Sequence, residues 1–379
     1  MNAAAPATRR VALVDLAAQH AEVADEVGVG FAAVLAETSF VQGKPVELFE
    51  QAYAAYIGVD HCIGVANGTD ALEMALRAVG VERGTEVVLP ANTFIATAGA
   101  VTRIGARPVL VDADPEHLLM DPLGVPAVIT ERTSALLPVH LYGQVAPMAA
   151  LLAAAESAGV PLVEDAAQSQ GARQGGRAAG SFGSAAGTSF YPGKNLGAYG
   201  DAGAVVTTSD DIARTVRLLG NHGSEVRYEH IEVGFNSRLD TLQAVVLSAK
   251  LARLERWNEA RRAAAVRYGE LLADLDGVRL PTTAPGNEHV WHLYVVRVPQ
   301  RDKVLADLNA AGIGAAIHYP TPVHLHPAYG WLGYRAGDFP VAEAAAGEIL
   351  SLPLHPHLTE QDQDHVAAVL RRAMQGAAA

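Results

Sequence analysis

The chain has 379 residues, of which 50% are hydrophobic and 18% are charged, and its formal net charge is -13 at pH 7. This apolar content can support a sizeable core, so we expect a large globular domain and a smaller one rather than a disordered chain. The acidic balance argues against nucleic acid as a partner, because phosphate binding needs clustered positive charge, although a few local donors would suffice for a small anionic substrate.

The cysteine content and the N-terminus indicate the compartment. The single cysteine, Cys62, excludes an internal disulfide and a cysteine-built metal cluster. Residues 1–10 lack the apolar core of a signal peptide, and no stretch approaches the roughly 20 uninterrupted apolar residues of a membrane span. We therefore expect a cytoplasmic protein without a membrane partner.

In the first two thirds of the chain, short β-branched runs alternate with alanine-rich helical stretches. This rhythm is typical of βαβ units on a mostly parallel sheet. The expected strands are 87–89, 108–111, 135–139, 161–163 and 204–207, and the expected helices are a stretch ending at 104, then 148–159 and 210–219.

After residue 248 the pattern changes. Residues 248–275 have the period of one long amphipathic helix, which would connect two domains. We predict a large cofactor-binding α/β domain over 11–250, and the connecting helix with a small C-terminal α+β domain over 251–379. The small domain is expected to contain strands 292–298 and 313–318 and helices 304–311 and 341–349.

Three features are expected at the carboxyl ends of the strands, where open α/β sheets bind ligands. The first is the turn Asn67-Gly68-Thr69-Asp70 at a strand-to-helix junction. Gly68 permits close backbone approach, Thr69 offers a hydroxyl, and the helix start presents free N–H groups, which together suit a phosphate. An ordinary turn with a helix N-cap explains the same residues.

The second feature is Asp165, which follows an apolar strand. An unpaired carboxylate is costly in such a poorly solvated place, and a protonated pyridine nitrogen would offset that cost. Gln168 lies one helical turn further on and could reach the same ligand. A helix N-cap is the competing explanation for Asp165.

The third feature is Lys194, in a loop that also contains Ser189. Unlike an arginine, a lysine can lose its proton and form a Schiff base, so Lys194 is a candidate for carbonyl chemistry, although a solvated surface lysine explains it equally well. The loop is not a nucleotide P-loop, because the spacing of Gly187 and Gly193 is wrong and Asn195 replaces the needed hydroxyl. Lysine is scarce in this chain and occurs only at Lys44, Lys194, Lys250 and Lys303.

Three histidines near residue 320 raise the alternative of a metal site. His318, His324 and His326 do not have a recognised zinc spacing, and neither a cysteine nor a nearby carboxylate completes the set. We therefore expect no metal.

A pyridoxal phosphate enzyme needs these three features in this order along the chain: a turn that binds phosphate, an acid at the end of a strand, and a lysine in a loop. Over nearly its whole length the chain resembles the DegT/DnrJ/EryC1/StrS family of sugar aminotransferases, which have the aspartate aminotransferase fold (fold type I). That resemblance implies a large mixed, mostly parallel sheet domain and a smaller C-terminal α+β domain. The motifs that carry it are 14–19, 90–97, 138–143, 164–168, 189–194, 234–240, 318–320 and 350–353.

The resemblance implies cofactor contacts. Lys194 matches the lysine that binds pyridoxal 5'-phosphate covalently and acts as the base, and Asp165 matches the acid that pairs with the pyridinium nitrogen. Gln168 matches a residue near the phenolic oxygen of the ring. Pyridoxamine phosphate would be the intermediate form. The remaining matches are an aromatic residue that stacks on the ring, Phe94, and the phosphate contacts Gly68, Thr69 and Ser189.

The resemblance also implies partners. Asn236 matches an asparagine that reaches the phosphate from the neighbouring subunit, which implies a homodimer with shared active sites. In that motif Ser237 replaces the usual aromatic residue, so a stacking role there is in doubt. The substrates would be a nucleotide-linked keto-sugar and glutamate, with 2-oxoglutarate released. Regions that would approach the sugar contain Tyr228, Arg238, His318 and Tyr319.

The exact reaction stays open at this point. The forms of the 14–19 and 66–72 motifs favour a thymidine-diphosphate-linked 3-keto-6-deoxyhexose over its 4-keto isomer. Uridine diphosphate is the alternative nucleotide, and a keto-inositol is an alternative to the nucleotide-linked sugar. Dehydration, as in relatives that replace the lysine with histidine, is disfavoured by Lys194. A non-catalytic sensing protein on the same scaffold is disfavoured because both Lys194 and Asp165 are present.

Overall fold

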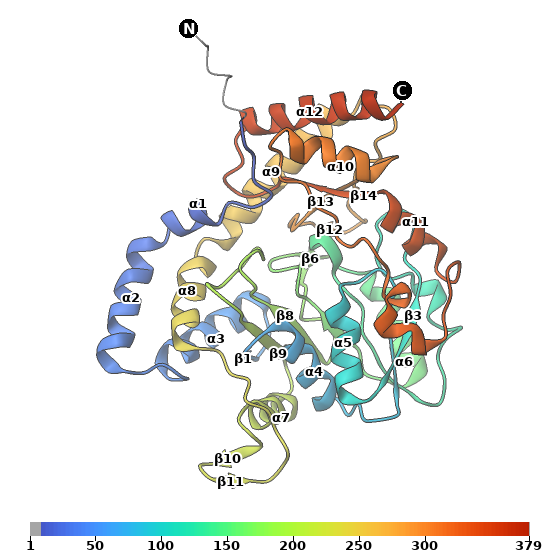
Figure 1. The fold of residues 1–379 in the computed structure, drawn as a ribbon. Coiled ribbons are helices and arrows are strands. Elements are labelled where there is room, and N and C mark those ends of the chain that lie inside the picture. Colours follow the sequence, from blue (N-terminus) through green and yellow to red (C-terminus); the bar gives the residue numbers. More distant parts are fainter. Residues whose placement is uncertain (1–8, 379) are drawn as a thin grey trace.

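The computed structural model describes residues 9–378 (Figure 1). Most of the N-terminal stretch in which we expect no signal peptide, residues 1–8, lies outside the described residues, as does residue 379 at the end of the predicted small domain. Among residues 9–378, each helix is too short or too polar to cross a lipid bilayer.

A mixed β-sheet forms the centre of the larger part of the molecule. Its strands run in the order β3-β2-β4-β5-β8-β9-β1, and parallel bridges from Leu136 to Leu162 and from Val139 to Asp165 join its two halves. Within this sheet only β9 runs against its neighbours, so the prediction of a mostly parallel sheet is confirmed. The strands are β1 (His61–Val65), β2 (Glu86–Pro90), β3 (Arg107–Val111), β4 (Thr133–Leu136), β5 (Val163–Asp165), β8 (Ala185–Ser189) and β9 (Gly203–Thr207).

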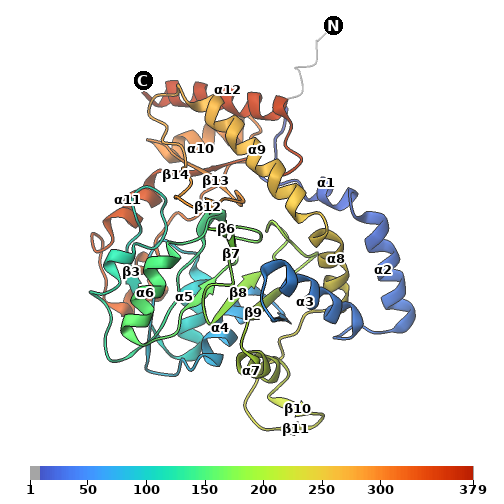
Figure 2. The ribbon, with the colours of Figure 1, turned by 180° about the vertical axis from the view of Figure 1, so that it is seen from behind.

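Helices cover both faces of this sheet, because successive side chains of a strand point to opposite faces and both sets are apolar here. Val87 and Leu89 pack in the cluster beneath α4, α5 and α7, whereas Val88 between them packs in the cluster beneath α6. Figures 1 and 2 show the two faces from opposite sides. The covering helices are α3 (Lys44–Ile57), α4 (Gly68–Ala78), α5 (Ile95–Ile104), α6 (Met148–Ala158), α7 (Asp210–Gly220) and α8 (Thr241–Leu251).

The C-terminal part has its own apolar cluster around an antiparallel pair of strands, β13 and β14. Residues between 323 and 342 pack instead into the cluster beneath α4 and α5, so the division at residue 250 stays a prediction. The elements of this part are α9 (Leu254–Leu272), β13 (Tyr294–Arg297), α10 (Arg301–Ala310), α11 (Pro340–Glu348), β14 (Ile349–Leu352) and α12 (Glu360–Ala378).

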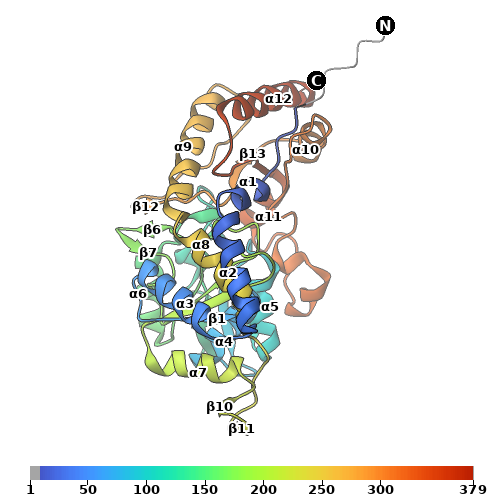
Figure 3. The same ribbon diagram turned by 90° about the vertical axis from the view of Figure 1, so that its left-hand side faces the viewer.

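The N-terminal segment connects the two parts. Val11 forms a parallel bridge with Ile313, and the Leu354 N–H donates to the Leu13 carbonyl over 3.3 Å. The chain then forms α1 (Leu16–Ala21) and α2 (Ala24–Glu37), and α2 packs along α8 on the outside of the molecule (Figure 3).

Short elements complete the fold. A hairpin of β10 and β11 projects beyond α7, away from the rest of the chain (Figure 1). The bounds are β6 (Arg173–Gln174), β7 (Arg177–Ala178), β10 (Ser224–Val226), β11 (Glu229–His230) and β12 (Asn287–Glu288), with 3-10 turns at Pro122–Gly124, Leu141–Gly143, Val323–Leu325 and Pro327–Leu332.

Two predicted elements are wrong. The single helix over 248–275 is divided into α8 and α9 by a turn at Ala252 and Arg253. The division follows from packing, because Leu247 of α8 is buried against the sheet and Leu272 of α9 is buried in the C-terminal cluster. Residues 313–318 form no strand; Ile313 and Ala316 make one bridge each to different neighbours, the N-terminal segment and β14.

Candidate active site

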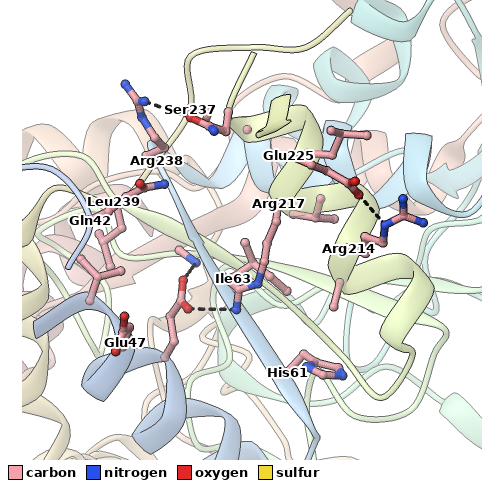
Figure 4. Close-up of a pocket in the computed structure, with 18 of the residues that line it drawn as sticks. Gln42, Glu47, His61, Ile63, Arg214, Arg217, Glu225, Ser237, Arg238 and Leu239 are labelled. Atoms are coloured by element: carbon pink, nitrogen blue, oxygen red, sulfur yellow. Dashed lines mark hydrogen bonds and ion pairs between the residues drawn. The ribbon is translucent and has the colours of Figure 1, made fainter. Parts of the chain in front are cut away.

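Two sizeable cavities compete as the functional site. One of about 630 Å³ lies between α3, α7 and the segment before α8 (Figure 4). Its charged groups largely neutralise one another: Arg217 pairs with Glu50 at 3.1 Å and Arg214 with Glu225 at 2.5 Å. The other cavity, of about 460 Å³, lies at the carboxyl ends of β5 and β8 and includes Lys194. The second is therefore the candidate active site.

A phosphate-sized cradle forms where α4 begins. Asn67 caps the helix by accepting a hydrogen bond from the Asp70 N–H at 2.9 Å, as the N-cap explanation predicts. Gly68 and Thr69 nevertheless line the cavity beside Ser189. A Cβ on Gly68 would lie 2.6 Å from the Ser189 Cβ, so only glycine permits this approach. The first-turn N–H groups and the Ser189 hydroxyl therefore lie together at the positive end of a helix.

Asp165 ends β5 and is 4% exposed. Its Oδ2 accepts from the Thr97 hydroxyl at 2.7 Å, and its Oδ1 accepts from the Ala167 N–H at 3.1 Å. Residues 166–171, all of them described, form turns, so the N-cap explanation is wrong. Burial raises the pKa of Asp165, and the hydrogen bonds and the Lys194 charge oppose that shift only in part. A buried carboxylate held by neutral donors is a site for a cationic partner.

Lys194 lies in the loop after β8, partly buried in the cavity wall. The loss of solvation lowers the pKa of its amine to about 8, and the attraction of Asp165 reduces this effect. In the described part of the chain, no hydrogen bond or ion pair engages its Nζ. The uncharged amine is thus far more abundant near neutral pH than in a solvated lysine, and it predominates above pH about 8, which suits a nucleophile and a base.

Aromatic and amide groups form a further part of the cavity wall. Gln168 is fixed at both ends, since its Oε1 accepts from the Tyr142 N–H at 2.8 Å and its Nε2 donates to the Tyr319 hydroxyl at 3.0 Å. The Tyr319 ring lies 5.0 Å from that of Phe94, which is 47% exposed. His318 lines the cavity next to Tyr319. An aromatic ring so accessible suits a flat ligand.

Three predicted residues lie outside this cavity in a single chain. The Asn236 Oδ1 accepts from Arg238 at 2.6 Å, and Arg238 lines the other cavity (Figure 4). Tyr228 is 79% exposed on the β10–β11 hairpin. The contact of Asn236 with the phosphate in a neighbouring subunit stays a prediction, as does the approach of Tyr228 and Arg238 to the sugar.

The histidines weighed as metal ligands are dispersed. His318 faces the cavity, whereas His324 is buried and pairs with Glu343 at 2.9 Å. Among the described residues, no group of three histidine, cysteine or acidic side chains has the arrangement of a metal site.

The sequence did not single out several residues of the cavity wall. Thr97 belongs to the motif 90–97 and His292 to the predicted strand 292–298, and both line the cavity. A polar residue within an apolar run is the signal that could have found them. Leu13 and Val14 of the N-terminal segment also line the cavity, although the motif 14–19 indicated only the family and the substrate and not a place in the cavity wall. Nothing local in the sequence brings them to Lys194, because their placement depends on the bridge from Val11 to Ile313.

Comparisons with known proteins agree with this geometry. The sequence model of the DegT/DnrJ/EryC1/StrS aminotransferase family matches residues 23–371. The chain is 48% identical to the "Erythromycin biosynthesis sensory transduction protein EryC1" of Saccharopolyspora erythraea, over 95% of this chain and 99% of that protein. It is also 48% identical to the dTDP-3-amino-3,4,6-trideoxy-alpha-D-glucose transaminase of Streptomyces venezuelae, over 93% of each.

Solved structures extend the likeness to the fold. The X-ray crystal structure of S. venezuelae DesV in complex with a ketimine intermediate superposes with a TM-score of 0.94 at 47% identity. The match covers 96% of this chain and 98% of that one. The predicted aspartate-aminotransferase-like fold is thereby confirmed.

Proposed function

The chain belongs to the DegT/DnrJ/EryC1/StrS aminotransferase family, and from this premise we propose that it aminates a thymidine-diphosphate-linked 3-keto-6-deoxyhexose with L-glutamate as donor. It is an aminotransferase, and its cofactor is pyridoxal phosphate. The observation that carries the proposal is the convergence of Lys194, Asp165 and the Gly68 cradle in one cavity.

The residues of the cavity fit the cofactor. The close approach of Gly68 to Ser189 leaves a cradle for the phosphate, and the buried carboxylate of Asp165 would hold the proton of the pyridinium nitrogen. Phe94 would cover the ring and Gln168 would lie near its phenolic oxygen. Lys194 would hold the carbonyl carbon through its Nζ.

Pyridoxal phosphate supplies an electron sink for the charge that remains when a proton leaves the carbon bearing the amino group. The protein supplies the proton transfer. Lys194 Nζ, in the uncharged form that its lowered pKa makes more abundant, would remove this proton and return it during the reaction. Asp165 stays ionised once a cation faces it, and the Thr97 hydroxyl holds its Oδ2 in place.

The names of the relatives support the substrate class. The S. venezuelae enzyme is named for a dTDP-linked 3-amino sugar, and a 43% identical protein of Acidithiobacillus ferrooxidans is named as a 3-aminotransferase of a UDP-linked 3-dehydro sugar. Both names place the nitrogen at carbon 3, which supports the 3-keto substrate over the 4-keto isomer or a keto-inositol.

We further propose a cytoplasmic homodimer in which Asn236 and Arg238 of one subunit reach the active site of the other. In one chain these residues lie outside the Lys194 cavity, on the segment that leads from the β10–β11 hairpin to α8. Exposed apolar side chains gather on the hairpin and this segment, which suits a protein surface covered by a second copy. They are Val226, Tyr228, Ile231 and Val233.

A regulatory role is the second candidate, because one relative is named a sensory transduction protein. A sensor has no need of an amine whose pKa is lowered next to a buried acid, and this chain has both. Catalysis is therefore the function that the geometry supports best. Retention of turnover by Lys194→Ala would contradict the role of this lysine.

The test uses the stable amino sugars. Holoenzyme free of 2-oxoglutarate is mixed separately with thymidine-diphosphate-linked 3-amino- and 4-amino-6-deoxyhexoses and with an aminocyclitol, and the visible absorbance of the cofactor is followed. We expect loss of the absorbance with the 3-amino sugar. A response only to the 4-amino sugar or only to the aminocyclitol would refute the proposed substrate and leave the aminotransferase class intact.

A further inference from the structure

A buried amide network lies directly behind the reactive lysine. Asn195, the residue after Lys194, donates through Nδ2 to the Asn258 Oδ1 and to the Val290 carbonyl, both at 2.9 Å. Asn258 in turn donates through its Nδ2 to the Gln170 carbonyl at 2.9 Å. Because carbonyl oxygens only accept, these contacts assign the nitrogen and oxygen atoms of both amides.

The network determines the tautomer of His292. With both Nδ2 hydrogens of Asn195 engaged, its Oδ1 faces the Nδ1 of His292 at 3.1 Å. An amide oxygen can only accept, so Nδ1 must carry the proton. The Nε2 of the neutral imidazole is then a hydrogen-bond acceptor without a proton.

The free nitrogen belongs to the Lys194 cavity. His292 is 8% exposed and lines this cavity, and no hydrogen bond within residues 9–378 engages its Nε2. Burial and the positive charges of Lys194 and Arg261 hold the pKa of the imidazole well below its usual value. His292 therefore stays a pure acceptor when the cavity is occupied.

We propose that His292 Nε2 accepts a hydrogen bond from a hydroxyl group of the sugar substrate. This inference rests on the proposed function, in which glutamate and a nucleotide-linked sugar use the same cavity in turn. A pure acceptor cannot bind a carboxylate or a phosphate, which are acceptors themselves. The donor that glutamate carries is its ammonium group, whose nitrogen is the atom transferred and is therefore taken up by the cofactor, whereas the sugar carries hydroxyl donors that the reaction leaves free.

Two substitutions separate this contact from the packing role of the ring. His292→Asn places an amide donor near the position of Nδ1, so it can keep the bond to Asn195 while it removes the acceptor in the cavity. His292→Gln places an amide oxygen near the position of Nε2 and gives up the bond to Asn195. His289→Asn is the matched control, because His289 is a buried histidine outside this cavity whose Nδ1 accepts from the Trp291 N–H.

The assay compares the two amino donors on the holoenzyme. We expect His292→Asn to lower kcat/KM for the thymidine-diphosphate-linked 3-amino sugar about tenfold to a hundredfold, the effect of losing one hydrogen bond to a buried donor. Its kcat/KM for glutamate should stay within about twofold of the wild-type value. His292→Gln should retain more of the sugar reaction than His292→Asn, and His289→Asn should behave as wild type.

Several results would overturn the proposal. If His292→Asn lowered kcat/KM equally for the amino sugar and for glutamate, Nε2 would act on Lys194 rather than on the sugar. If it left kcat/KM for the amino sugar unchanged, the proposed contact would be refuted. Nitrogen-15 NMR of histidine-labelled protein gives an independent readout of the tautomer. The signal of His292 is the one that is missing in His292→Asn. If that signal showed the proton on Nε2, the proposed tautomer would be refuted. Wild-type protein that reacts with glutamate but with no nucleotide-linked amino sugar would refute the proposed function, and this contact with it.

Discussion

Replacement of Gly68 by alanine tests the phosphate cradle. The new Cβ would lie 2.6 Å from the Ser189 Cβ and 3.1 Å from its Cα, about 1 Å short of ordinary contact. Because the backbone of β8 is one of the obstructing groups, α4 and β8 must move apart. Such overpacking costs about 1–3 kcal/mol. If the displaced backbone no longer holds the phosphate, this energy is lost from the binding free energy of the cofactor. Its affinity then drops about fivefold to 150-fold, at about 1.4 kcal/mol for each factor of ten.

The assay is a titration of cofactor-free protein with pyridoxal phosphate, followed by absorbance, together with thermal unfolding of the same samples. Gly269→Ala is the matched control, since this helical glycine has no atom within 4 Å of an added Cβ. It should leave the affinity unchanged and stabilise the protein by up to about 1 kcal/mol, through the better helix propensity of alanine. Wild-type affinity in Gly68→Ala would refute the cradle.

Other predictions follow from the same cavity. Cofactor-free protein should bind pyridoxal phosphate at a rate that rises with pH up to about 8 and then levels, because the lowered pKa of Lys194 makes its amine uncharged above that value; a rise continuing toward 10.5 in stopped-flow experiments would indicate an ordinary, solvated lysine. Asp165→Asn should slow transamination by about two to three orders of magnitude through the loss of a buried charge partner, and a wild-type rate would exclude pairing with the ring. Thr97→Val should raise the pKa of Asp165 further and slow the reaction about tenfold, whereas Ser134→Ala, which removes a hydroxyl away from the cavity, should have little effect.

The main chemistry of the cavity could be predicted from the sequence because the residues that perform it lie at the ends of strands. Gly68 follows β1, Asp165 ends β5 and Lys194 follows β8, and the strands of a parallel sheet present their carboxyl ends at one edge. Period and composition also predicted α5, α6 and α7 among the helices that cover the sheet. The competing N-cap explanation was correct at Asn67 and wrong at Asp165, where a turn takes the place of a helix.

What could not be predicted depends on contacts between distant segments. The turn between α8 and α9 follows from two separate apolar clusters, and the helical period of residues 248–275 is the same whether or not the helix bends. The tautomer of His292 depends on Asn195, Asn258 and the carbonyls of Gln170 and Val290, which no spacing in the sequence connects. Long-range hydrogen bonds have no local signal.

The placement of the N-terminal segment has a consequence for synthesis of the protein. Leu13 and Val14 belong to the cavity wall, but the segment is held by Ile313 and Leu354, which are synthesised late. At about 5–20 residues per second, translation between the two ends takes on the order of tens of seconds. During that interval the sheet can form with its cradle, while the cavity stays open on one side. A nascent chain can therefore acquire its fold well before it can acquire its activity.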